Sequence, residues 1–167
     1  MLKPRTLVFV TLTLAALAAQ AQMPNPYGPP VGVEAARKLA AAAVAEAKKN
    51  GWNVAAAVVD IAGDLVFFER MDGTQVGSVQ VSQEKARSAV RFKRPTKAFE
   101  EALAGGRQAI LGLPGAVPLE GGIPLVVDGK IIGAVGVSGA TSQQDGSCAQ
   151  AAVDTLGKPA AAAPAKK

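Results

Sequence analysis

The chain has 167 residues, of which 49% are hydrophobic and 19% charged, with one cysteine, no histidine and a formal net charge of +5. A single cysteine excludes an intrachain disulfide. The absence of histidine excludes the Ser-His-Asp triad, the Cys-His pair, histidine zinc sites and any axial histidine ligand to a cofactor.

The positive charge is concentrated at the two ends of the chain. Of the eighteen Lys and Arg residues, two fall in residues 1–21 and three in residues 157–167, so residues 33–156 carry thirteen cations against thirteen Asp and Glu. The central part of the chain is therefore neutral. Because nucleic-acid binding requires a basic surface, we expect no nucleic-acid partner.

Residues 1–21 have the pattern of a secretory signal peptide. Lys3 and Arg5 precede an apolar run from Leu7 to Ala19, and Ala19-Gln20-Ala21 is an A-x-A cleavage site. The alternative, a retained transmembrane anchor, is disfavoured because the run is short and lacks a stop-transfer flank. We expect a periplasmic or secreted protein with no stable membrane span after cleavage.

The rest of the chain divides into three segments. Residues 22–32 form a proline-rich lead, residues 33–156 have the length of one domain, and residues 157–167 form a low-complexity tail that cannot build a core.

Within the domain, apolar spacing predicts a helix over Val33–Lys49, ended by Gly51. Trp52–Val59 is apolar on both alternations and predicts a buried strand, which should pair antiparallel with the run Leu65–Met71. Helical spacing returns over Val79–Phe92 and, after Pro95, over Thr96–Ala104.

The second half of the domain predicts a hairpin and a closing helix. Ala109–Leu113 is interpreted as a short strand, and Asp128-Gly129 as a type I′ turn between the runs Ile123–Val127 and Ile131–Val137. Gly133 and Gly136 lie on opposite faces of the second run, where a missing Cβ permits close approach.

Thr141 or Ser142 can cap the last helix, in which Asp145 suits the N-terminal dipole. Cys148 is interpreted as a small buried residue of this helix, with intermolecular pairing or thiol reactivity as the alternative. Together these elements predict an α+β fold: an antiparallel sheet of about five strands flanked by helices.

Several phrases of the sequence resemble one family. They are VVDIAGDLVFFERMDG at 58–73, KARSAVRFKRPTKAFE at 85–100 and LPGAVPLEGGIPLVVDGKIIGAVGVSGATSQQD at 113–145, together with the helix starting at Val33. The chain resembles the GlcG/HbpS family of small haem-binding and haem-degrading domains, also found as the C-terminal domain of PduO-type proteins. The resemblance implies a profilin-like α/β/α sandwich, a haem cofactor and a homo-oligomer.

Arg87, Arg91 and Arg94 are spaced four and three apart, and Lys97 follows after the proline. On a helix such a stripe projects from one side, and its guanidinium groups suit the propionates of a tetrapyrrole or another anionic small molecule. The alternative is a solvated face paired with Glu84, Glu100 or Glu101.

Thr96 is the residue that the resemblance favours for direct contact with the ligand, as a weak oxygen ligand to haem iron. A helix-capping threonine is the alternative. Met71 and Tyr27 are other conceivable axial ligands, since haem accepts thioether or phenolate. The resemblance also implies that Ser138 and Gly139 line the same cleft as Thr96.

Glu120 lies between Pro118 and Gly121-Gly122, where an irregular backbone can hold a carboxylate at the mouth of a site, as a cation ligand or a general base. A solvated turn carboxylate is the alternative.

The leading prediction is an exported, non-enzymatic protein that binds haem or a related tetrapyrrole loosely in a shallow site near Thr96. One alternative is an enzyme that degrades haem or acts on a small organic acid through Glu120 and the arginines. The other is an oligomeric interaction or signalling partner.

Overall fold

The computed structural model describes residues 25–157. The elements run in the order α1 (Val33–Lys49), β1 (Ala55–Val59), β2 (Leu65–Arg70), α2 (Ser78–Phe92), α3 (Lys97–Ala104), a 3₁₀ helix η1 (Gln108–Gly112), β3 (Gly122–Val127), β4 (Lys130–Ser138) and α4 (Ser142–Val153). The predicted signal peptide, the first residues of the lead and nearly all of the tail lie outside the described residues.

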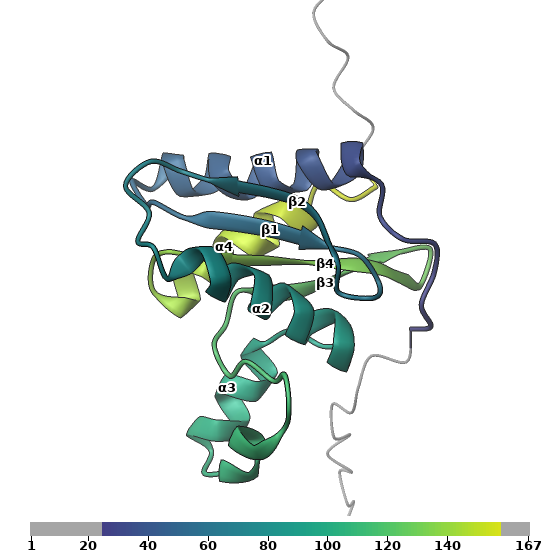
Figure 1. Cartoon of the computed structure of the whole chain (residues 1–167), viewed down its shortest axis with the longest axis vertical. Helices are drawn as coiled ribbons and strands as arrows, with labels where there is room; N and C mark the ends of the chain where they lie inside the picture. Colours follow the sequence, from purple (N-terminus) through teal and green to yellow (C-terminus); the bar gives the residue numbers. More distant parts are fainter. Residues whose placement is uncertain (1–24, 158–167) are drawn as a thin grey trace, which may run out of the picture.

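A single antiparallel sheet with strand order β2-β1-β4-β3 forms the middle layer of the domain (Figure 1). Helices α1 and α4 pack together on one face, and α2 covers the other face along β4, β1 and β3. The α3 helix and η1 extend away from the sheet below α2. The α+β class and the α/β/α layering predicted from the sequence are confirmed.

Alanine and valine make up most of the buried core. All five residues of β1 are fully buried because helices cover both faces of that strand. On α1 the buried positions include Ala36, Ala40, Ala43 and Ala47, at helical spacing, so this helix lies close to the sheet. Cys148 is also fully buried on α4, as predicted.

The hairpin prediction is confirmed in detail. Asp128 and Gly129 both have positive φ angles, 48° and 71°, as a type I′ turn requires, and β3 pairs antiparallel with β4 across them. Thr141 caps α4 in a capping box with Gln144, which resolves the choice between Thr141 and Ser142.

The expectation of about five strands is wrong by one. The segment Ala109–Leu113, interpreted as a strand, falls instead within and beside η1, and the sheet among the described residues has four strands. The segment has no sheet edge to pair with, because it belongs to the unit of α3 and η1 that stands away from the sheet. Among residues 25–157 no helix is both long enough and apolar enough to cross a bilayer.

The close approach of α2 to the sheet depends on Gly136. A Cβ at this position would meet the Ser82 carbonyl oxygen, the Ala86 backbone nitrogen at 2.6 Å and the Ala86 side chain at 3.0 Å. Since the obstructing atoms are helix backbone, α2 must lift away from β4 to accept a methyl group.

We therefore expect Gly136→Ala to lower the free energy of unfolding by roughly 1–3 kcal/mol, measured by urea denaturation. The control is Gly77→Ala at the start of α2, where a Cβ meets nothing within 4 Å and φ is −61°; it should change stability by less than about 1 kcal/mol. Equal stability of the two variants would contradict the close contact between α2 and β4.

Candidate binding cleft

The segment Glu120–Gly121–Gly122, which leads into β3, lies at the centre of the candidate site. Gly121 has a φ of +130°, and a Cβ there would lie 2.9 Å from Lys85 Nζ and 2.7 Å from the Val137 carbonyl oxygen. At Gly122 a Cβ would collide with the Lys85 carbonyl oxygen and with Thr96 Cγ2. Only glycine fits at these two positions, so the Gly-Gly pair brings this segment directly against α2 and the start of α3.

Thr96 holds this segment in place. Its backbone N–H donates to the Gly122 carbonyl oxygen at 2.9 Å, and its side-chain oxygen accepts from the Gly122 N–H at 2.9 Å. The side chain is fully buried, and it makes no capping hydrogen bond to α3. Thr96 therefore fixes the backbone beneath the site rather than presenting its hydroxyl to solvent, and contact with a ligand through that hydroxyl stays a prediction.

An open cavity of about 590 Å³ adjoins this segment, between α4, the start of α3 and the start of β3. Its lining combines small and apolar surface with a polar rim: Glu46, Pro95, Lys97, Glu120, Gly121, Gly122, Ile123, Gly146, Ser147, Gln150, Ala151 and Asp154. The cavity therefore lies beside Thr96, because Pro95, Lys97 and Gly122, which flank or contact Thr96, line it.

Lys97 and Glu120 form an ion pair across the mouth of this cavity. Lys97 Nζ lies 3.3 Å from Glu120 Oε2, with the lysine side chain 53% exposed and the glutamate side chain 18% exposed. The backbone N–H of Glu120 donates to Glu100, whose other oxygen accepts from the Ser142 hydroxyl at 2.9 Å. Glu100 thereby links α3, α4 and the glycine segment.

The arginine stripe does not converge on the cavity. Helix α2 ends at Phe92, and Lys93 adopts a left-handed conformation with φ 51°, so Arg94 no longer shares a helical face with Arg87 and Arg91. Arg87 donates to the Gly63 carbonyl oxygen at 3.1 Å and pairs with Glu84 at 2.8 Å. This pairing matches the alternative of a solvated, ion-paired face.

Arg91 packs against Gly115, and Arg94 stacks on the Phe99 ring at 5.5 Å. None of the three arginines lines the 590 Å³ cavity. The expectation that all three lie on one side of a helix is wrong for Arg94, because α2 ends at Phe92, whereas Arg87 and Arg91 lie one turn apart on α2. Of the predicted cations, Lys97 is the one that reaches this cavity.

The other predicted residues are placed elsewhere. Ser138 lines a second, smaller cavity, and Gly139 packs against the Asn53 backbone, so neither shares the larger cavity with Lys97 and Glu120. The Tyr27 hydroxyl donates to the Val90 carbonyl oxygen at 2.9 Å, and Met71 packs against the main core cluster. Neither of these side chains lines the larger cavity.

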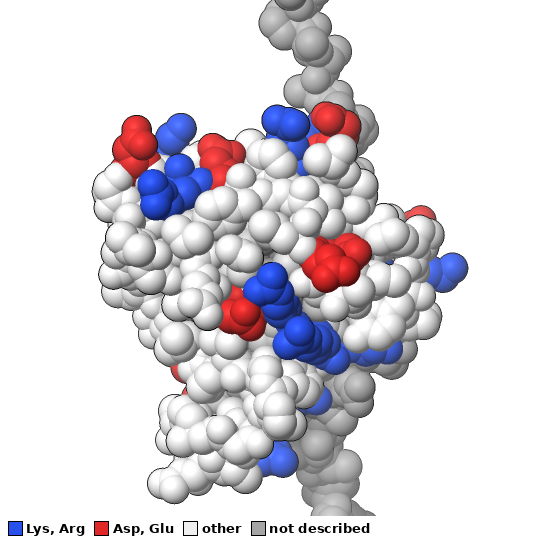
Figure 2. All heavy atoms as spheres, in the orientation of Figure 1, with Lys and Arg blue, Asp and Glu red and all other residues white. Residues whose placement is uncertain are grey.

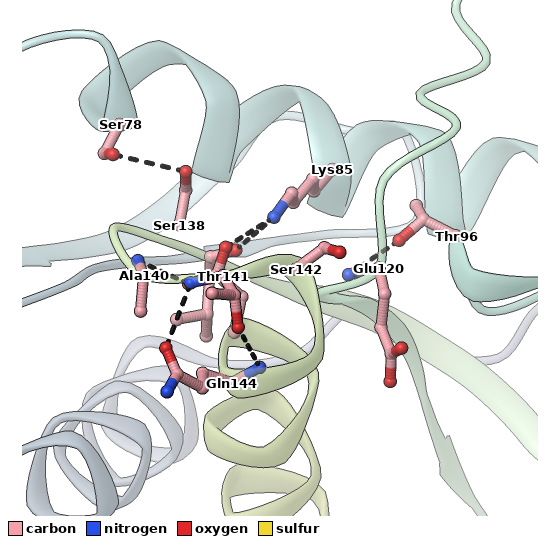
Figure 3. A network of polar contacts seen from close by, with 12 residues as sticks. Ser78, Lys85, Thr96, Glu120, Ser138, Ala140, Thr141, Ser142 and Gln144 are labelled. Carbon is pink, nitrogen blue, oxygen red and sulfur yellow. Dashed lines mark hydrogen bonds and ion pairs between the residues drawn. The ribbon is translucent and has the colours of Figure 1, made fainter. Parts of the chain in front are cut away.

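The sequence reasoning missed a buried ion pair behind the glycine segment. Lys85 Nζ lies 2.8 Å from Asp145 Oδ2, and the two side chains are only 2% and 3% exposed. The same ammonium donates to the Val137 carbonyl oxygen at 3.1 Å, and Asp145 Oδ1 accepts from the Ala140 N–H at 3.0 Å (Figure 3). This pair joins α2, the end of β4 and the start of α4.

Burial raises the pKa of the Asp145 carboxyl, and the charge and hydrogen bond of Lys85 oppose that shift. Burial also raises the pKa of the Cys148 thiol to about 11, with the negative charges of Asp145 and Glu46 adding to the effect. The thiol is therefore protonated and weakly nucleophilic at neutral pH. Among residues 25–157 no group of three or more acidic or cysteine side chains is arranged to hold a metal ion.

Comparison with known proteins gives the family. Residues 31–154 match the family described as "Haem degrading protein HbpS-like". The chain belongs to this family.

Relatives at the sequence and structure levels agree with that assignment. The chain is 48% identical to Protein GlcG of Escherichia coli K12 over 103 residues, which are 62% of this chain and 77% of GlcG. A double mutant of Streptomyces reticuli HbpS has a TM-score of 0.72 and 30% identity, covering 92% of this chain and 100% of that one. A haem complex of PduOC has a TM-score of 0.70 and 28% identity, covering 77% of this chain and 96% of that one.

We expect Lys85→Met to lower the free energy of unfolding by roughly 3–5 kcal/mol, because it leaves the Asp145 carboxylate buried without a counter-charge. Thermal and urea unfolding of the variant measure this loss. The double variant Lys85→Met with Asp145→Asn should recover part of it, since no charge is then buried.

The matched control is Glu84→Gln, which breaks the partly exposed pair with Arg87 and should cost at most about 1 kcal/mol. A loss for Lys85→Met as small as that of Glu84→Gln would show that the buried pair does not hold α2 and α4 together.

Proposed function

We propose that this chain is an exported protein that binds haem or a related tetrapyrrole in the 590 Å³ cavity. The observation that carries the proposal is the combination of this open cavity with membership of the HbpS-like family, one of whose structural relatives is described as a haem complex. Export is part of the proposal because of the signal-like pattern of residues 1–21.

The shape of the cavity suits a flat ligand. Gly121, Gly122 and Gly146 contribute surface without side chains, and Ile123 and Ala151 add apolar contact. The cavity is lined by residues of α4 and by residues at the start of α3 and β3, so a planar ring would lie between these elements.

The charges of the cavity suit a ligand with carboxylate arms. Lys97 is half exposed and its partner Glu120 is more buried, so the ammonium can exchange its contact with Glu120 for a propionate at the cavity mouth. The side chains that would hold the ligand are therefore Lys97 at the rim and the glycine segment at the floor, with Thr96 fixing the floor from behind.

The side-chain atoms at the cavity that are able to coordinate iron are mainly oxygens. Carboxylates of Glu46, Glu120 and Asp154, the Ser147 hydroxyl and the Gln150 amide line it, and no methionine, tyrosine or cysteine among residues 25–157 does. Bound haem would supply an iron centre for redox chemistry. Without an imidazole, thiolate or thioether at the site, we propose loose, exchangeable binding rather than a permanent cofactor.

We also propose that the protein forms a homo-oligomer. Several apolar side chains are unusually exposed, among them Val76 at 82% and Leu111 at 68%. Figure 2 shows that the charged side chains on one face are interspersed in sign and leave broad uncharged areas between them. For a small domain with few aromatic residues, covering such apolar surface between subunits adds buried area.

A cavity-filling variant tests the haem proposal. Ala151→Leu adds volume to the α4 wall of the cavity, and Ala41→Leu adds the same volume at an exposed position of α1 that does not line it. We expect haemin titration, followed by the Soret absorbance, to show affinity weakened roughly fivefold or more by Ala151→Leu and unchanged by Ala41→Leu. Equal affinities, or no spectral change in the parent protein at micromolar haemin, would overturn the proposed site.

A charge-removal variant tests the role of Lys97. Lys97→Ala should weaken haemin binding by about two- to fivefold at low salt, and the difference from the parent should shrink as salt screens the ion pair. Lys38→Ala removes the same charge from an exposed position of α1 and serves as the control. If both variants weaken binding equally, only the net charge of the protein matters and Lys97 makes no specific contact.

A further inference from the structure

A second cavity, of about 360 Å³, lies on the other side of the glycine segment from the cleft. Leu119 lines the smaller cavity, whereas Glu120, Gly121 and Gly122 line the larger one. Its walls come from the first turns of α2, the end of β4 and the start of α4, and its lining includes the buried Lys85.

Two buried side chains that line this cavity, Lys85 and Ser78, have more hydrogen-bond donors than acceptors among the described residues. The Lys85 ammonium carries three N–H groups, and among the described residues only Val137 and Asp145 accept from it. The Ser78 and Ser138 hydroxyls share one hydrogen bond of 3.3 Å, so one hydroxyl hydrogen of this pair has no acceptor in the described part of the chain (Figure 3). Lys85 and Ser78 are 2% and 1% exposed, so bulk water reaches them poorly.

Unused donors on buried side chains are costly unless something accepts from them. The two donors line one cavity and come from the same helix, seven residues apart on α2. An acceptor that binds in this cavity therefore lies near both donors.

The local field favours an acceptor with negative charge. Asp145 lines the cavity, but its two oxygens are engaged by Lys85 and by the Ala140 N–H, and it lies in the first turn of α4, whose positive end also offsets its charge. The first turn of α2 has no acidic residue and no side-chain cap. The N-terminal end of α2 therefore adds a positive potential that no acidic side chain of its own first turn offsets.

The rest of the lining is mixed, with apolar surface from Val81 and Leu119 and polar side chains from Gln75 and Ser142. Val81 and Leu119 face the cavity, and Leu119 is 46% exposed. The volume is too small for a large planar ring and suits a short organic molecule with one polar end.

We propose that the 360 Å³ cavity is a binding site for a small monocarboxylate, whose carboxylate accepts from Lys85 and Ser78 and whose short apolar chain lies against Val81 and Leu119. This site is separate from the proposed tetrapyrrole site and does not depend on it, because the two cavities share no lining residue.

Titration of the full chain with butyrate, followed by two-dimensional ¹H–¹⁵N NMR, tests the proposal. We expect saturable shifts of the Ser78 and Ser138 amide signals with butyrate and none with butyramide, which has the same shape without the charge. Ser78→Ala should weaken butyrate binding about tenfold, because a hydrogen bond to a charged group is lost. Ser82→Ala removes another buried hydroxyl of α2 that does not line the cavity and should leave butyrate affinity unchanged.

Val81→Trp provides a second variant that fills the cavity from a partly exposed position without touching the ion pair. It should abolish the butyrate shifts while leaving haemin binding unchanged, because Val81 does not line the larger cavity. Equal binding of butyrate and butyramide, or butyrate affinity unchanged in both Ser78→Ala and Val81→Trp, would overturn the carboxylate site whatever the outcome of the haemin titration.

Discussion

The structure depends on the ion pair between Lys85 and Asp145, which is buried where α2, β4 and α4 meet. Taking two charges out of water costs several kcal/mol per ion, and attraction repays that cost only when the remaining hydrogen-bonding groups are satisfied. Here the Val137 carbonyl oxygen and the Ala140 N–H add to the network, and every buried side-chain nitrogen or oxygen in the described part of the chain has at least one partner, although one N–H of the Lys85 ammonium has no acceptor there. The pair therefore connects α2 and α4, which lie on opposite faces of the sheet.

The position of this ion pair constrains the path of the chain into β3, and with it the two cavities beside that segment. The chain entering β3 must pass within contact distance of Lys85 and Thr96, and two glycines make this possible. The segment then separates two spaces of different chemistry. The larger cavity is open and rimmed by a partly exposed ion pair, whereas buried donors and a mixture of apolar and polar side chains line the smaller one. The two proposed ligands, a broad flat ring and a small acid, therefore belong to different sides of the same segment.

Much of the fold could be predicted from the sequence because local signals agreed with the global arrangement. Three local patterns each indicated one structure: Asp128-Gly129 a tight turn, the alanine spacing of α1 a helix, and the apolar run of β1 a buried strand. The segment Ala109–Leu113 was misassigned because a short apolar run does not distinguish a strand from a helical turn without its neighbours. Its position in the unit of α3 and η1 depends on tertiary contacts that the pattern does not contain.

The site was harder to predict. The arginine spacing indicated one helical face, but the left-handed Lys93 ends the helix before Arg94. Thr96 lies between Pro95 and Lys97, which line the larger cavity, and its own burial beneath Gly122 depends on the approach of two segments far apart in the chain. Lys85 had a detectable signal, because it lies on the same helical stripe as Ser78, Ser82 and Ala89, and a lysine on a small-residue stripe indicates a buried charge.

The most direct measurement of the central claim is the ionisation of the two buried partners in the folded protein, from the ¹⁵Nζ signal of Lys85 and the ¹³Cγ signal of Asp145 at neutral pH. The account predicts an ammonium whose hydrogens exchange slowly with water and a carboxylate that is ionised, both shifting together when the protein is acidified. A Lys85 signal that exchanges as fast as that of an exposed lysine, or a protonated Asp145 at neutral pH, would contradict it.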